Sequence, residues 1–239
     1  MNEILSDAKR ILYTAIQASL PDEAVKKFID GKTFAFEGRV IVIAIGKAAW
    51  NMAKAAAENI PHRIDTGIVL TKYDHAKGEI PGFTILEAGH PLPDENTILG
   101  TQKIMDAVSG LTEKDTVFFL VSGGGSALFE CPAGKLTLAD FLDITDQLLK
   151  CGADIVEINT IRKHLSAVKG GKFAKLCAPA QVYCIALSDI LGDRPDSIAS
   201  GPACADASTA AEAFAISEKY KLKLTEEMRK QLATETPKT

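Results

Sequence analysis

Cysteine is scarce in this sequence, and the few cysteines present form no recognisable framework. The 239 residues include five, at positions 131, 151, 177, 184 and 204, and no two of them form a C-x-x-C pair. An odd number of widely spaced cysteines excludes a disulfide scaffold and a zinc-finger type of site. We therefore expect five reduced thiols, most of them filling the core as free cysteines usually do.

Excess positive charge and long apolar runs are missing as well. The net charge is -4, so the chain lacks the basic field that binding to DNA or RNA requires. No stretch approaches the roughly 20 consecutive apolar residues that span a bilayer, and residues 1–20 lack the basic-then-apolar order of a signal peptide. We expect a cytoplasmic protein whose partner is a small-molecule substrate, with no nucleic acid and no membrane bound.

What the sequence does contain is an alternation of apolar runs and helical patterns. Hydrophobic residues make up 46% of the chain, enough for a sizeable core. Five apolar runs are typical of strands: residues 40–45, 67–71, 83–86, 116–121 and 182–187. Helical spacing is found in residues 4–16, 22–29, 48–58, 95–108, 138–150, 154–165, 208–220 and 225–233. This order predicts an α/β fold with a doubly wound, Rossmann-like parallel sheet and helices on both faces.

A run of three glycines between two serines follows the fourth apolar run. It reads Ser122-Gly123-Gly124-Gly125-Ser126 and is called the glycine turn below. Open parallel sheets bind ligands outside the carboxyl ends of their strands, and glycines let consecutive N–H groups point into one concavity. We therefore interpret the turn as a nucleotide phosphate site, with a ligand-free strand-to-helix connection as the alternative. The sequence of the turn matches neither the Walker A motif nor the dinucleotide-binding fingerprint.

Charged residues end two other apolar runs. Lys47 follows the first run where a helix should begin, and a cation is unfavourable beside the positive helix end unless an anion lies between them. We expect Lys47 to face phosphate, and simple exposure to solvent is the alternative. Asp189 and Asp193 follow the fifth run and are candidates to hold Mg²⁺ against phosphate oxygens. A helix cap is the alternative for Asp189.

Four more residues are candidates for substrate or cleft contacts. Asn159 and Arg162 fall at helical spacing, and the guanidinium fork of Arg162 suits a carboxylate or phosphate. A solvated helix face is the alternative for both. Lys169 belongs to a second, cationic turn that contains glycine. His90 lies in a stiff, proline-rich loop from which it could touch substrate, although loop histidines more often have no catalytic role.

Taken together, five strings resemble the family of glycerate 2-kinases whose second half is a MOFRL domain. In chain order they are IGKAA (45–49), GHPLPD (89–94), VSGGGSAL (121–128), INTIRKHLSAVKGGK (158–172) and SDILGD with IASGP (188–202). The resemblance covers nearly the whole chain. It implies a phosphotransferase that uses ATP and Mg²⁺ to convert D-glycerate to 2-phosphoglycerate. It also implies that Lys47 stabilises the transferring phosphoryl group, that the glycine turn holds phosphate, and that Asp189 is the acidic position, binding metal or activating substrate.

The resemblance also bears on domain organisation. It predicts that residues 1–239 are the amino-terminal, Rossmann-like domain of a two-domain kinase, with the carboxyl-terminal MOFRL domain absent from this chain. Phosphoryl transfer needs charge neutralisation from both sides, so we expect the chain alone to be inactive or nearly so. Two alternatives stay open, an NAD(P)-dependent hydroxypyruvate reductase and a non-catalytic module that binds a sugar acid or phosphate. The preferred hydroxy acid and the existence of a homodimer are also open.

Overall fold

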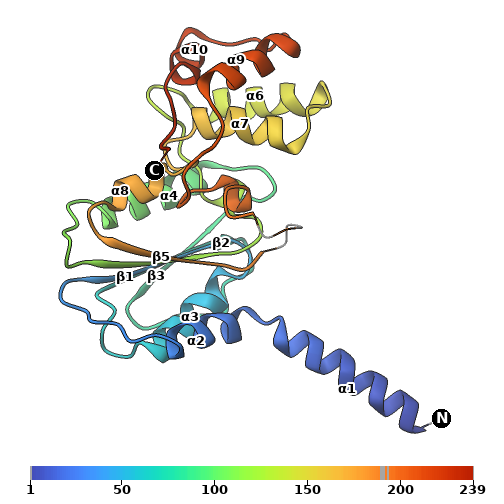
Figure 1. The fold of residues 1–239 in the computed structure, drawn as a ribbon, viewed down its shortest axis with the longest axis vertical. Helices are drawn as coiled ribbons and strands as arrows, with labels where there is room; N and C mark the ends of the chain where they lie inside the picture. Colours follow the sequence, from blue (N-terminus) through green and yellow to red (C-terminus); the bar gives the residue numbers. More distant parts are fainter. Residues whose placement is uncertain (1, 189–191, 193, 239) are drawn as a thin grey trace.

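Strands and helices alternate along most of the chain in the computed structural model, which describes residues 2–188, 192 and 194–238. Figure 1 shows the elements, whose bounds are as follows. They are α1 (Asn2–Ala18), α2 (Pro21–Asp30), β1 (Val40–Ile45), α3 (Ala49–Asn59), β2 (Thr66–Lys72), β3 (Phe83–Ala88), α4 (Glu95–Ala107), β4 (Thr116–Val121), α5 (Gly125–Leu128), α6 (Leu138–Lys150), α7 (Ile155–Leu165), α8 (Lys172–Cys177), β5 (Gln181–Ala186), η1 (Ile198–Ser200), α9 (Ala210–Lys219) and α10 (Glu226–Leu232).

The five strands form one sheet in the order β3-β2-β1-β4-β5, and every pairing is parallel. The central strands β1 and β4 are buried along their whole length, which explains their unbroken apolar sequences. The chain adds β2 and β3 on one side of β1 and then β4 and β5 on the other, so the order of the strands reverses between β1 and β4. The predicted doubly wound parallel sheet is confirmed.

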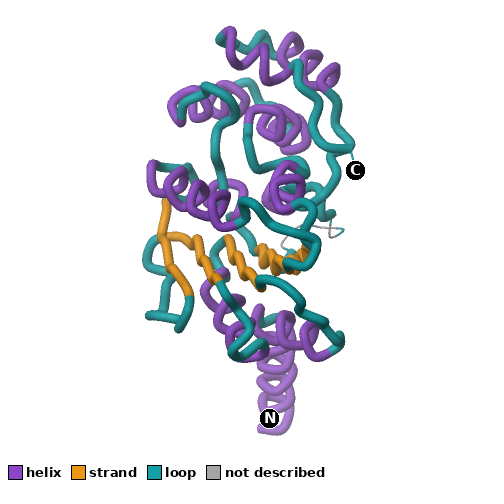
Figure 2. Tube along the Cα trace, turned by 90° about the vertical axis from the view of Figure 1, so that its left-hand side faces the viewer, coloured by secondary structure: helices purple, strands orange, loops and turns teal. Residues whose placement is uncertain are grey.

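Alternate residues of each strand point into two separate cores. Ile41, Ile43 and Ile45 of β1 pack in a core with α4, α5 and α8. Val40 and Val42 face the other way, toward α2 and α3. Figures 1 and 2 show these helices as two layers, one on each face of the sheet.

Four helices form a third layer beyond the sheet, called the helical cap below (α6, α7, α9 and α10). It has its own core, in which Phe141 and Ile144 of α6 meet Ile161 of α7 and Met228 of α10. In Figure 1 the cap lies at the end of the molecule opposite α2 and α3. Periodicity predicted all four helices but not that they pack on one another away from the sheet.

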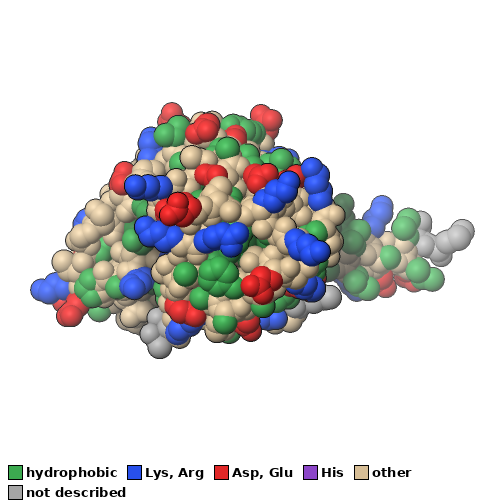
Figure 3. Space-filling model, turned by 90° about the horizontal axis from the view of Figure 1, so that it is seen from above, with side chains coloured by type: hydrophobic (Ala, Val, Ile, Leu, Met, Phe, Trp, Pro, Cys, Tyr) green, Lys and Arg blue, Asp and Glu red, His purple; other side chains and the backbone are tan. Residues whose placement is uncertain are grey.

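The first helix differs most from its expected environment. Helix α1 forms as predicted, yet its described side chains are exposed, including Ile4 at 77% and Ile11 at 68%. Figure 3, which looks onto the helical cap, shows α1 projecting from the side of the molecule with hydrophobic side chains along it. None of the helices among the described residues is long and apolar enough to cross a membrane.

The cysteines are free, as expected, but most do not fill the core. Cys177 is the buried one, whereas Cys151 and Cys184 are exposed and the other two are half-buried. The expectation that most of them are core residues is therefore wrong. Small size lets cysteine occupy helix ends and edge strands, and Cys184 lies on the edge strand β5.

Candidate functional site

The site is built where the two central strands end. Ile45 of β1 and Val121 of β4 are register partners, so the residues after them lie side by side. The Lys47 amide donates to the Gly123 carbonyl at 2.9 Å, which ties the end of β1 to the glycine turn.

Ser122 anchors the turn from inside. Its hydroxyl donates to the Ile45 carbonyl at 3.1 Å and accepts from the Ala48 amide at 3.0 Å. The residue is 1% exposed, so both bonds are internal. Gly46, at φ 105°, packs so closely on Ser122 that a Cβ would collide with it. Ser122 therefore shapes the turn and does not present its hydroxyl to the cleft.

Gly124 lies where two predicted site residues approach the turn. It has a left-handed φ of 89° and is the cap residue of α5, which is only one turn long. A Cβ at Gly124 would lie 3.1 Å from His90 Nε2 and 3.2 Å from Lys47 Cγ. These two predicted site residues therefore flank the turn, although they are 43 positions apart in the sequence (90 - 47).

The side of the turn that carries Lys47 and His90 is cationic and open. Lys47 is exposed and His90 is half-buried. Burial lowers the pKa of His90, and the nearby charges of Lys47, Lys72 and His75 lower it further. Lys72 is the last residue of β2 and His75 follows that strand, and neither was selected as a site residue from the sequence. Their position at the end of a strand on the same sheet edge was the available signal.

The glycine turn also lines a cavity of about 460 Å³, called the turn cavity below. Its lining includes the glycine-turn residues 123–126 together with Asn159, Arg162 and Arg194. Among the described residues this lining contains two guanidinium groups and no carboxylate. Such a surface favours an anion. Asn159 and Arg162, which their spacing places on one helix face, both line this cavity and are half-buried, so this face is not fully solvated.

Arg162 also holds the turn in place. Its Nη2 donates to the Ser126 carbonyl at 2.8 Å, and its guanidinium lies 5.1 Å from the ring centre of Phe141. Burial lowers the pKa of Arg162, while the charge of Glu130 opposes that shift. The side chain therefore contributes to the cavity wall and to the shape of the turn at once.

Lys169 lies behind the turn and not in the cleft where the sequence placed it. Its ammonium is fully buried, donates to the Phe129 carbonyl at 2.8 Å and lies 3.4 Å from Glu130 Oε2. Burial lowers the pKa of Lys169 to about 8, against the opposing effect of Glu130. Sequence reasoning missed Glu130, which is fully buried just after α5. The only feature of the sequence that could have identified Glu130 is a carboxylate directly after the apolar residues 128–129.

A hydroxyl chain joins the turn to the helical cap. Ser126 Oγ lies 3.2 Å from Ser200 Oγ, which donates to Asn159 Oδ1 at 2.9 Å. Ala199 and Ser200 both have positive φ, at 51° and 61°. Such backbone conformations are costly for residues other than glycine and concentrate at functional sites. Ser200 is a further site residue that was not selected from the sequence.

The two predicted metal ligands, Asp189 and Asp193, lie outside the described residues. Within the described part of the chain, no three His, Cys, Asp or Glu side chains gather in a way that could hold a metal ion.

Comparison with known proteins identifies the family of this chain. A family model described as "Domain of unknown function (DUF4147)" matches residues 7–233. The chain belongs to this family. The DUF4147 chain is 50% identical over 231 residues to the D-glycerate 2-kinase of Thermotoga maritima, an alignment that covers 97% of the chain and 55% of the relative. A relative from Agrobacterium vitis, provisionally named a hydroxypyruvate reductase, is 43% identical over 234 residues, which cover 96% of the chain and 52% of that protein.

A solved structure matches the DUF4147 chain closely. The crystal structure of a glycerate kinase from Thermotoga maritima superposes with a TM-score of 0.95 at 48% identity, covering 100% of this chain and 57% of that one. The chain therefore spans about half the length of the relatives it matches. The resemblance inferred from the five strings is confirmed at the level of the family.

Proposed function

We propose that this DUF4147 chain supplies the nucleotide phosphate site of an ATP-dependent D-glycerate 2-kinase, a phosphotransferase that forms 2-phosphoglycerate. The observation that carries the proposal is the glycine turn, with Lys47 and His90 against Gly124 and with Arg162 in the lining of the turn cavity. The names of the Thermotoga maritima relatives support the same reaction.

The side chains divide the work as follows. The turn cavity, with its two guanidinium groups, binds the ATP phosphates, and Lys47 meets the transferring phosphoryl group as it passes Gly124. A point charge there stabilises negative charge that develops during transfer. Lys47 and Lys72, the lysines whose charges reach His90, attract the carboxylate of the hydroxy acid. Mg²⁺, when bound, would neutralise phosphate charge, and Asp189 and Asp193 are its proposed ligands.

The proposal extends to the rest of the enzyme. We propose that residues 1–239 act as the amino-terminal domain of a two-domain, cytoplasmic kinase whose MOFRL half supplies the opposite wall of the cleft. The relatives are almost twice the length of the chain, which supports this division. A homodimer also remains part of the proposal, and light scattering of the purified protein tests it.

The central experiment joins the chain to the matching second half of the Thermotoga maritima relative and measures ATP-dependent phosphorylation of D-glycerate. We expect activity in the joined protein and almost none in the 239-residue chain. Lys47→Ala should lower kcat by about 10²- to 10³-fold, as loss of a charge-stabilising donor does. Lys103→Ala, at an exposed lysine on α4, is the control. Equal activity of the Lys47→Ala variant and the control would remove Lys47 from the reaction.

A reductase is the competing activity, and the name of the Agrobacterium vitis relative favours it. The glycine turn lacks the third glycine of a dinucleotide fingerprint, since Leu128 stands at that position. Titration with NADPH separates the two activities. Tight NADPH binding without ATP binding would overturn the kinase proposal in favour of the reductase. Binding of ligand without turnover in the joined protein would instead favour the non-catalytic module.

A further inference from the structure

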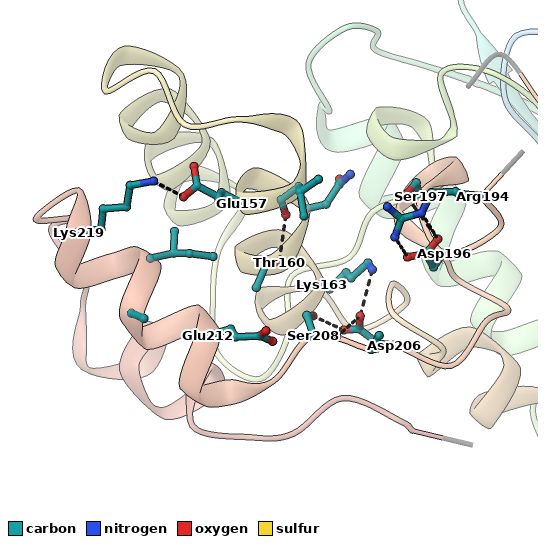
Figure 4. Close-up of a pocket in the computed structure, with 15 residues that line it drawn as sticks. Glu157, Thr160, Lys163, Arg194, Asp196, Ser197, Asp206, Ser208, Glu212 and Lys219 are labelled. Atoms are coloured by element: carbon teal, nitrogen blue, oxygen red, sulfur yellow. Dashed lines mark hydrogen bonds and ion pairs between the residues drawn. The ribbon is translucent and has the colours of Figure 1, made fainter. Parts of the chain in front are cut away.

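A second cavity lies next to the turn cavity, inside the helical cap. It has a volume of about 460 Å³ and is called the cap cavity below. Figure 4 shows it between α7, which carries Glu157, Thr160 and Lys163, and α9, which carries Glu212 and Lys219. The segment with Arg194, Asp196 and Ser197 closes one end. The volume falls in the range of pockets that hold small organic ligands.

The two cavities share a wall. Val156, Asn159, Arg194 and Ser197 line both of them. Val156 is 59% exposed at the beginning of α7, so the shared wall presents an apolar side chain to any ligand that crosses it. The two cavities are therefore adjacent at Val156 and Asn159 of α7.

The charges of the two cavities differ. Three ion pairs line the cap cavity, and each carboxylate in them has its own cation. Lys163 Nζ lies 3.0 Å from Asp206 Oδ1, Lys219 Nζ lies 2.6 Å from Glu157 Oε1, and Arg194 Nη2 lies 2.7 Å from Asp196 Oδ2. Glu212, a fourth carboxylate of the cap cavity lining, belongs to none of the three pairs. Arg194 lines both cavities, so Arg162 is the guanidinium of the turn cavity that has no ion pair among the described residues. The cap cavity thus has a slight excess of negative charge, whereas the lining of the turn cavity is cationic.

The cap cavity also combines apolar walls with a fixed polar floor. Val156 and Ile216 provide apolar surface on α7 and α9. Asp206 is 2% exposed and is held by Lys163, by Ser208 Oγ at 2.8 Å and by Thr236 Oγ1 at 2.8 Å. A flat heterocycle with a polar edge needs this mixture of apolar contact and rigid polar groups.

We propose that the cap cavity binds the nucleoside part of the nucleotide whose phosphates occupy the turn cavity. The inference rests on the proposed function, because it assumes that the turn cavity holds a polyphosphate. The base and sugar lie between α7 and α9, and the phosphate chain passes Val156 and Asn159 to reach the glycine turn. The helical cap is then a nucleoside-binding module set on the sheet.

The test separates the two parts of the ligand. Calorimetry on the 239-residue chain compares the binding of ATP with the binding of inorganic tripolyphosphate, which lacks a nucleoside. Ala215→Trp and Ala207→Trp fill the cap cavity from two sides. Both alanines are exposed, so neither substitution disturbs the packing of the core. Ala211→Trp is the matched control, because Ala211 is exposed on the same helix but does not line the cavity.

We expect both cavity-filling variants to weaken ATP binding by about 10- to 100-fold, equivalent to about 1.4–2.8 kcal/mol, with tripolyphosphate binding unchanged. The Ala211→Trp control should match the wild type for both ligands. If the two variants bind ATP like the wild type, the nucleoside site is elsewhere and the phosphate site still stands. If the variants bound ATP and tripolyphosphate with equally reduced affinity, the inference would also be overturned, since the substitutions would then have disturbed the glycine turn. Failure of the wild type to bind either ligand would overturn the proposed function together with the inference.

Discussion

The glycine turn has an open side and a buried side, and both carry charged side chains. On the open side, Lys47 and His90 approach Gly124. On the buried side, behind the turn, Lys169 and Glu130 form a fully buried ion pair, and Lys169 donates a hydrogen bond to the Phe129 carbonyl. An exposed lysine is available to a ligand, whereas a buried and hydrogen-bonded one holds the backbone in place. The comparison separates residues that we expect to act on substrate from residues that keep the turn in shape.

The largest expected effect concerns the buried side. Glu130→Ala leaves the Lys169 ammonium buried without its carboxylate, which typically lowers the free energy of unfolding by about 3–5 kcal/mol. Urea denaturation followed by circular dichroism measures the change. Lys47→Ala is the control, since an exposed side chain should alter the free energy by less than about 0.5 kcal/mol.

A double variant sharpens the same test. Glu130→Leu with Lys169→Met replaces the buried pair by apolar side chains and should recover most of the lost stability. Similar unfolding curves for Glu130→Ala and Lys47→Ala would contradict the distinction between the two sides of the turn.

A smaller effect follows from the pKa of Lys169, which burial lowers to about 8. Between that value and the ordinary pKa near 10.5, the unfolded chain binds a proton that the folded chain has released. The contribution of Lys169 to stability therefore rises with pH across this window, by up to about 1.4 kcal/mol per pH unit. The slope of unfolding free energy against pH should be less positive in Lys169→Met than in the wild type. Parallel slopes from pH 8 to 10 would show that Lys169 does not titrate there.

The smallest effect concerns the open side. Burial and the charges of Lys47, Lys72 and His75 lower the pKa of His90. Removing one of those charges in Lys47→Ala should move the pKa of His90 upward, and a bound anion should move it in the same direction. Nuclear magnetic resonance titration of the histidine rings measures both shifts. An unchanged His90 titration in Lys47→Ala would mean that the charge of Lys47 does not reach His90. The two side chains would then not act on one ligand.

The sheet was predictable because its strands have strong local signals. The unbroken apolar runs of β1 and β4 correspond to strands buried on both faces. Three short helices, α5, α8 and η1, were missed, because pieces of six residues or fewer lack a full apolar period. The assembly of α6, α7, α9 and α10 into a separate cap was also missed, since periodicity locates an apolar face but not its partner.

The site was predictable only in part, for a related reason. Lys47 and the glycine turn follow neighbouring strands, so their juxtaposition follows from the topology of a parallel sheet. The direction in which each side chain points does not follow from the topology. Ser122 and Lys169 point inward and Glu130 is buried, because each meets backbone or charged partners from distant segments. The roles of Asp189 and Asp193 stay predictions.

The most direct test of the central claim is a crystal structure of the chain with a non-hydrolysable ATP analogue. We expect phosphate oxygens against residues 123–126, with the Lys47 ammonium on the terminal phosphate and the base between α7 and α9. Phosphates bound away from the glycine turn, or beyond the reach of Lys47, would contradict it.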